Sequence, residues 1–174
     1  LASYAFFTLI IQYIAYANLG VQHNLINELS KEKSNYKLLI GDSYIIIAII
    51  SFFILMLGIL FPNLFNFLKK YDIYNYLLLI LIIGITTNIN LLNVRIGRKR
   101  RDYFYLVVES LLYPLGIIIL CLNFENINFQ GFIVVYAICK ILPLILFLIK
   151  YVRLCEIKIN EITWRFKNII SKSL

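Results

Sequence analysis

Two charged side chains lie deep inside long apolar segments of this sequence. Glu109 stands about two helical turns into segment 103–123, and Lys140 stands near the middle of segment 130–150. Because a charge in hydrocarbon is unfavourable, such residues face a partner or an aqueous cavity. Their chemistry is then a buried ion pair between two helices, or contact with a substrate or a coupling ion. A lysine that reaches back to the lipid surface is the third reading.

Uncharged polar residues recur along the same segments at helical spacing. Tyr105, Glu109 and Tyr113 follow every fourth residue, and Tyr136 precedes Lys140 by four, so each set shares one helical face. Two earlier segments carry similar stripes, Thr8, Gln12, Tyr16 and His23 on one and Thr86, Asn90, Asn93 and Gly97 on the other. Such stripes can line a hydrated lumen or join helices by hydrogen bonds. The candidate substrate or cavity residues are Lys140, Glu109, Tyr136, Tyr105, Tyr113, Gln12 and Asn90.

No combination of residues indicates catalysis, a metal or a cofactor. Paired carboxylates, a nucleophile elbow, a glycine-rich phosphate loop and a zinc motif are all missing from the sequence. His23 is the only histidine, with no ligand-type residue at metal spacing. Cys121, Cys139 and Cys155 are scattered, without metal or redox spacing. We therefore expect no enzyme activity and no cofactor.

The composition indicates a membrane protein. Hydrophobic residues make up 61% of the 174 residues and charged ones 15%, which a soluble domain of this size cannot bury. No charge occurs from Ser43 to Leu68 or from Ile73 to Val94, and both runs exceed the roughly 18 residues that mark a membrane helix. The net charge of +8 comes from cations in the connections, so we expect no nucleic-acid partner.

Five apolar segments predict an all-α, polytopic membrane helical bundle that occupies the whole chain as one membrane-spanning domain, 1–174. Each segment is near the length of roughly 20 residues that crosses a hydrocarbon core, and none alternates as a barrel strand does. Asp42 is expected in the headgroup zone, without a special role. The predicted spans are 4–21, 38–61, 74–94, 103–123 and 130–150, followed by a cytoplasmic tail, 151–174.

The lysines and arginines orient these spans. The second connection holds only Lys69 and Lys70, and the fourth holds none. The other connections and the tail are cationic, with Lys31, Lys33 and Lys37 in the first, Arg95, Arg98, Lys99, Arg100 and Arg101 in the third, and Lys150, Arg153, Lys158, Arg165, Lys167 and Lys172 at or after the end of the fifth span. Because cytoplasmic loops carry the excess of Lys and Arg, these connections and the tail are expected in the cytoplasm.

Short motifs of the first segment resemble a known family. Ser3-Tyr4-Ala5-Phe6-Phe7 opens a helix that closes on Ala17-Asn18-Leu19-Gly20-Val21, and Asn27-Glu28-Leu29-Ser30-Lys31 follows. This resembles the polysaccharide (O-antigen) flippases of the multidrug/oligosaccharidyl-lipid/polysaccharide exporter superfamily, although Asn27 stands where the family usually has Arg. The basic run Arg95–Arg101 is similar to the family's connection between helices four and five. The run Ile162–Lys167 is similar to its amphipathic stretch before helix seven.

The resemblance implies a partial N-terminal lobe, covering helices two to six of a two-lobed, alternating-access transporter. Such a protein moves a polyprenyl-pyrophosphate-linked oligosaccharide repeat unit across the bacterial cytoplasmic (inner) membrane for surface polysaccharide biosynthesis, with a cation as a possible coupling ion. Cationic cavity residues of the family are thought to meet the anionic headgroup, which makes Lys140 the first candidate and Glu109 its partner or a coupling-ion group.

Other functions remain open from the sequence. A drug or peptidoglycan-precursor exporter of the same superfamily would share these helices. A non-transporting membrane assembly subunit would use the polar residues only to join helices. A membrane-embedded glycosyl- or acyltransferase would need a catalytic residue near the interface, where only His23 and Asp42 stand.

Overall fold

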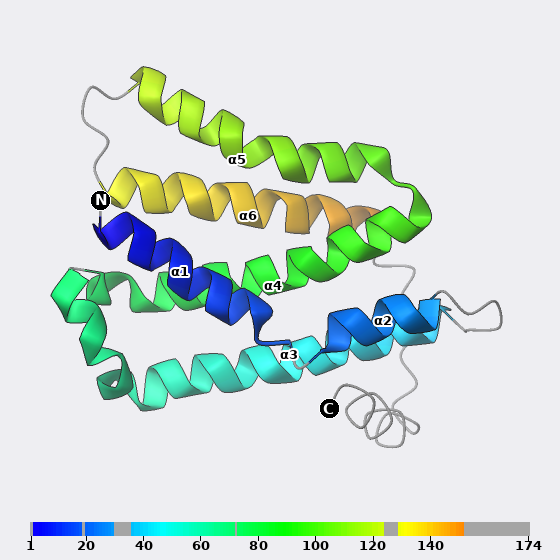
Figure 1. Ribbon diagram of the computed structural model, residues 1–174, viewed down its shortest axis with the longest axis horizontal. Helices are drawn as coiled ribbons and strands as arrows, with labels where there is room; N and C mark the ends of the chain where they lie inside the picture. Colours follow the sequence, from blue (N-terminus) through cyan, green and yellow to red (C-terminus); the bar gives the residue numbers. More distant parts are fainter. Residues whose placement is uncertain (1, 19, 30–35, 72, 124–128, 152–174) are drawn as a thin grey trace.

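The computed structural model is a bundle of long helices (Figure 1). It describes residues 2–18, 20–29, 36–71, 73–123 and 129–151, and these residues contain no strand, as the sequence predicts. The predicted tail after Tyr151, with Cys155 and Ile162–Lys167, lies outside the described residues, as do Lys31 and Lys33. The elements are α1 (Ala2–Tyr16), α2 (Val21–Leu29), α3 (Tyr36–Leu60), η1 (Pro62–Tyr71), η2 (Tyr74–Tyr76), α4 (Leu77–Arg100), α5 (Tyr103–Asn123) and α6 (Phe129–Tyr151).

Helix α4 is the centre of the bundle, because it packs against α1, α2, α3, α5 and α6. In the most apolar part of each helix, 56% of α4 is buried, against 28% for α3 and 39% for α6. One apolar core joins α4 to α1 and α6 around Phe7, Ile11 and Ile133. A second joins α4 to α2 and α3 around Leu25 and Ile40. The sides of the bundle that face away from α4 expose Leu, Ile and Phe, as lipid contact requires.

Among the described residues, three helices are long and apolar enough to cross a membrane: Lys37–Leu60, Tyr74–Arg100 and Phe129–Lys150. They correspond to the second, third and fifth predicted spans. The first predicted span, counted as one broken span, makes a fourth candidate. The fourth predicted span is helical over its predicted range, Tyr103–Asn123, and its role as a fifth crossing remains a prediction.

The prediction of one continuous first helix over 4–21 is wrong. Residues 2–16 and 21–27 form two helices that meet at 59°. The Asn18 side chain accepts a hydrogen bond from the Gly20 N–H at 3.1 Å, and Gly20 has a φ of 76°. An asparagine that bonds the backbone two residues on, followed by a glycine in the left-handed region, makes a turn in place of a helical turn. The predicted closing turn is therefore present, and α2 continues beyond it.

The third predicted connection is also largely helical. Helix α4 continues six residues past the predicted end at Val94, so Arg95 and its cationic neighbours up to Arg100 stand on its last turns. Arg101 ends the helix with a φ of 57°, and its N–H bonds the carbonyls of Arg98 and Gly97. Asp102 directly follows as the residue before α5. The α4–α5 connection is thus only two residues long. Helix α5 turns back there and diverges from α4, and α6 lies between the two (Figure 1).

The second predicted connection is the 3₁₀ helix η1 rather than a loop. It begins at Pro62 and runs across the end of the bundle between α3 and α4 (Figure 1). The other end of the bundle collects the start of α3 and the ends of α4 and α6, which carry Lys37, Arg98 and Lys150. These cations predict that this second end faces the cytoplasm.

Asp42 is more enclosed than its predicted place near the membrane surface suggests. It lies in the second turn of α3 and is only 3% exposed, so the bundle buries its carboxyl. The reason is that α2 folds back beside the start of α3 (Figure 1). Helix α2 covers a face that an extended first span would have left open.

Candidate functional site

The two charged residues of the membrane core are brought together. Glu109 on α5 and Lys140 on α6 face each other, with Oε1 and Nζ 4.0 Å apart, so the predicted ion pair is present. Their side chains are 22% and 17% exposed respectively. The pair is therefore shielded by the bundle yet still open on one side. An ion pair at this depth is unfavourable to separate without a replacement partner.

Close packing of α5 on α6 sets the position of the pair. A Cβ on Gly116 would lie 2.7 Å from Cys139 Sγ and 2.9 Å from Val135 Cγ1, so only glycine permits this approach. The Cys139 thiol donates to the Leu112 carbonyl across the same interface, at 3.2 Å. Small residues at helix contacts are the usual means of close approach in membranes.

The tyrosines of the predicted stripes lie along this interface. Tyr136 is one turn before Lys140, whose Nζ stands 5.7 Å from the ring centroid of Tyr136. Tyr113 packs edge-to-face on Tyr136 with centroids 5.1 Å apart. A cation near an aromatic face is held by the ring quadrupole, more strongly where water is excluded. The stripe on α5 thus faces α6, and Lys140 lies between a carboxylate and an aromatic wall.

Asn90 of α4 contacts the backbone of Lys140 and so joins the central helix to this site. Its Nδ2 donates a 2.6 Å hydrogen bond to the backbone carbonyl of Lys140. Its Oδ1 is buried and has no hydrogen-bond partner among the described residues. A buried amide oxygen without a partner is unfavourable by about 1–3 kcal/mol. It can be satisfied by a water molecule, a hydroxyl group or a cation.

Asn93 and Tyr105 extend the polar region toward the end of α4. The Tyr44 hydroxyl of α3 donates to Asn93 Oδ1. Tyr105 packs edge-to-face on Phe147 at 5.0 Å and lies near Asn93 and Glu109. Asn93 Nδ2 and the Tyr105 hydroxyl are both buried without a hydrogen-bond partner among the described residues. We call the five residues Asn90, Asn93, Tyr105, Glu109 and Lys140 the polar core.

A second polar network links α2 to α4, and sequence reasoning missed it. Gln22 donates to the carbonyl and the Oδ1 of Asn88, at 3.2 and 3.1 Å, and accepts from Arg95 Nε at 3.2 Å. Gln22 and Asn88 are 3% and 1% exposed. Gln22 was missed because the first span was expected to end at Val21. Asn88 stood beside the predicted stripe, although any asparagine inside an apolar helix indicates an interhelical contact.

The predicted stripe on the first helix does not join the polar core. Phe7, Ile11 and Ala15 form the buried face of α1. Gln12 and Tyr16 are exposed on the outer side, and His23 is exposed on α2. The spacing of the stripe is right, but its direction is outward. The cause is that α1 buries large apolar residues against α4, which leaves the polar face away from the bundle.

The polar core combines opposite charges with buried polar atoms. Among the described residues, no three His, Cys, Asp or Glu side chains lie close enough to bind a metal. The polar core offers one cation, one carboxylate and three neutral polar atoms that have no hydrogen-bond partner among the described residues. In a site of low dielectric, an incoming anion can compete with Glu109 for Lys140, and an incoming cation can compete with Lys140 for Glu109.

Comparison with protein-family models, with curated proteins and with solved structures finds no match for this chain.

Proposed function

We propose that this chain belongs to a flippase, which transfers a polyprenyl-pyrophosphate-linked oligosaccharide across the bacterial cytoplasmic membrane by alternating access. The observation that carries the proposal is the Glu109–Lys140 pair, 4.0 Å apart and partly exposed inside a bundle of apolar helices. A pair open on one side leaves Lys140 available to a second anion.

The chemistry of the polar core suits a pyrophosphate headgroup. A phosphate oxygen that reaches Lys140 replaces Glu109 as the partner of the ammonium group, so the charge is never left alone in the membrane. Glu109, once released, can take up a proton or a cation, which provides a route to coupling. Asn90 donates from Nδ2 to the carbonyl of the same lysine, and its Oδ1, which has no hydrogen-bond partner among the described residues, can accept from a sugar hydroxyl.

The broken first span supports a transport function. Helices α1 and α2 meet at 59° around the Asn18–Gly20 turn, and α2 is tied to α4 by Gln22. Discontinuous membrane helices are frequent in transporters, where they flank binding sites and allow one part of the bundle to move. The turn also coincides with the Asn-Leu-Gly motif through which the chain resembles polysaccharide flippases.

A vesicle assay of the protein expressed from its native gene tests this function. The protein is reconstituted with a lipid-linked oligosaccharide in the inner leaflet, and a membrane-impermeant glycosidase is added outside. We expect time-dependent cleavage, reduced at least about tenfold in the Lys140→Gln variant. Lys99→Gln, an exposed cation at the end of α4, is the matched control and should retain the rate. No cleavage above protein-free vesicles by the wild-type protein would refute the proposal.

The same assay with other substrates distinguishes an oligosaccharide flippase from other exporters of the superfamily. A peptidoglycan precursor shares the lipid pyrophosphate but carries a peptide, and a cationic drug lacks the anion. Faster transfer of either one than of the oligosaccharide would reassign the protein to that class of exporter. Equal retention of all three on their starting side would favour an assembly subunit.

Accessibility of position 140 is an independent check. Lys140→Cys, in a background without Cys121, Cys139 and Cys155, should react in intact membranes with a water-soluble thiol reagent. Ile133, fully buried in the apolar core, provides the matched unreactive site as Ile133→Cys. Failure of position 140 to react while a cysteine at Lys99 does react would show that no aqueous path reaches the polar core.

A further inference from the structure

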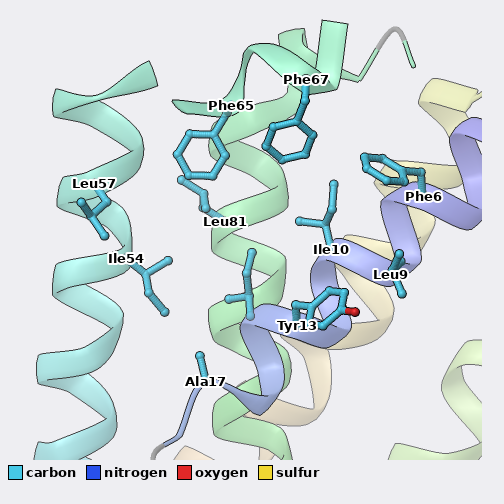
Figure 2. Close-up of a pocket in the computed structure, with 11 residues that line it drawn as sticks. Phe6, Leu9, Ile10, Tyr13, Ala17, Ile54, Leu57, Phe65, Phe67 and Leu81 are labelled. Carbon is cyan, nitrogen blue, oxygen red and sulfur yellow. The ribbon is translucent and has the colours of Figure 1, made fainter. Parts of the chain in front are cut away.

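An apolar groove lies between α1 and α3, over α4, and is closed at one end by η1 (Figure 2). Its volume is about 480 Å³. Leu57 of α3, Phe65 and Phe67 of η1, and Leu9 and Tyr13 of α1 surround it in Figure 2. Leu57 and Leu9 are 47% and 43% exposed, so the groove opens to the side of the bundle. Since α3 and α4, which form two of its walls, are long and apolar enough to cross a membrane, we expect it to open to hydrocarbon.

The length of the groove matches one leaflet. Its lining on α1 runs from Phe6 to Ala17, which is about 16 Å at the rise of an α-helix. The hydrocarbon core of a bilayer is roughly 30 Å thick, so one leaflet is about half of that. The groove therefore has the depth of a single acyl chain. With its headgroup at the η1 end, a long isoprenoid chain would extend well past the opposite end of the groove, near Ala17.

Two cations follow the groove-lining residues of η1 in sequence. Phe67 lines the groove, and Lys69 and Lys70 follow on the same helix, both exposed. Phe6, which also lines the groove, stacks on Tyr71 with centroids 4.0 Å apart. The groove wall thus continues through Phe6 to Tyr71, which directly follows Lys70. Lys69 Nζ lies 4.9 Å from the ring centroid of Tyr74, in an aromatic belt typical of the membrane interface.

We propose that this groove binds an anionic phospholipid of the leaflet on the η1 side. One acyl chain occupies the groove between α1 and α3, and the phosphate group contacts Lys69 and Lys70. The bound chain fills the space that α1 and α3 leave above α4 and so braces α1 ahead of its break at Asn18–Gly20. The site is separate from the polar core, and it stands whether or not the protein is a flippase.

Photo-crosslinking in nanodiscs tests the site. The protein as expressed from its native gene is placed in discs of phosphatidylcholine with a tracer of photoactivatable phosphatidylglycerol or of photoactivatable phosphatidylcholine. We expect the phosphatidylglycerol probe to label groove peptides of α1, α3 and η1. Leu57→Trp fills the groove and should reduce this labelling at least about fivefold. Leu122→Trp, at a 79% exposed position of α5 outside the groove, is the matched control and should leave it unchanged.

The headgroup contact has its own variant. Lys69→Gln with Lys70→Gln should abolish the preference for phosphatidylglycerol, since each lysine near an anionic lipid contributes up to about fivefold. Arg98→Gln with Lys99→Gln at the opposite end should keep the preference. The proposal is overturned by equal labelling with the two probes in the wild-type protein, by labelling that Leu57→Trp leaves intact, or by no labelling of the groove. The last outcome would show that another protein segment covers it.

Discussion

The side-chain amide of Asn90 donates a 2.6 Å hydrogen bond to the backbone carbonyl of Lys140. This contact joins the central helix α4 to α6 at the residue that carries the charge of the polar core. A carbonyl oxygen has two lone pairs, so that of Lys140 can accept the hydrogen bond from Asn90 and also a backbone hydrogen bond within α6. The bond holds the backbone of Lys140 in place beside α4, while its side chain pairs with Glu109 of α5.

Removal of one member of the Glu109–Lys140 pair should destabilise the bundle more than removal of both. We expect Glu109→Gln and Lys140→Met each to lower the free energy of unfolding in bicelles by about 1–3 kcal/mol, because a charge is left alone in the membrane. The double variant should recover about 1 kcal/mol of that loss. Ser110→Ala, at an exposed neighbour that bonds only its own helix, is the control. A coupling energy indistinguishable from zero would show that the 4.0 Å contact does not contribute to stability.

Gly84 should tolerate no side chain unless α1 changes with it. A Cβ there would lie 2.6 Å from Ile14 Cγ2 and 2.7 Å from its Cβ. Gly84→Ala should therefore lower the thermal midpoint, at a cost of about 1–3 kcal/mol, and Ile14→Ala in the same chain should restore part of it. A Cβ at Gly97 would have Tyr105 Cδ1 as its nearest atom, at 3.3 Å, so Gly97→Ala should have a smaller effect. Equal loss from Gly84→Ala and Gly97→Ala would contradict this account of the α1–α4 contact.

The Gln22 network should hold α2 against α4. Gln22→Leu leaves Arg95 Nε and Asn88 Oδ1 without their partner, so we expect a loss of about 1–2 kcal/mol. Amide hydrogen exchange should rise in α2 while α6 stays protected. His23→Gln, at the exposed adjacent position, should not change the exchange of α2. Unchanged protection of α2 in Gln22→Leu would mean that its apolar contacts around Leu25 suffice.

Asp102 should act on α5 in two separable ways. Its Oδ1 accepts from the Tyr105 N–H at 3.3 Å as a helix cap, and its Oδ2 pairs with Lys150 Nζ at 2.8 Å. Asp102→Ala loses both and should cost about 1–2 kcal/mol. Asp102→Asn keeps the cap, and Lys150→Met removes the pair while leaving the cap in place. Since the lysine of the pair is 51% exposed, each should cost less than about 1 kcal/mol. Chemical denaturation in detergent gives the order, and a loss from Lys150→Met as large as that from Asp102→Ala would reverse it.

The sequence alone determined that the chain is helical and that its apolar runs are long enough to cross a membrane, because charge-free runs of this length have few alternatives. It also placed Glu109 and Lys140 at similar depth, because an antiparallel helix pair with a short connection brings equal distances from the connection together. The stripe Tyr105–Glu109–Tyr113 followed from helical periodicity, and the structure turns it toward α6.

Only the tertiary structure decided which polar faces turn inward. Periodicity defines a face but not its direction, so Gln12 and Asn90 looked equivalent in sequence. Gln12 is exposed because Phe7 and Ile11 are buried on the opposite side of α1, whereas Asn90 is buried because α4 is surrounded by five helices. The break at Asn18–Gly20 was a second such decision. The Asn-Leu-Gly turn could be recognised in the sequence. The 59° bend and the return of α2 along α3 depend on contacts of Gln22 with Asn88 and Arg95, which are 66 and 73 residues away.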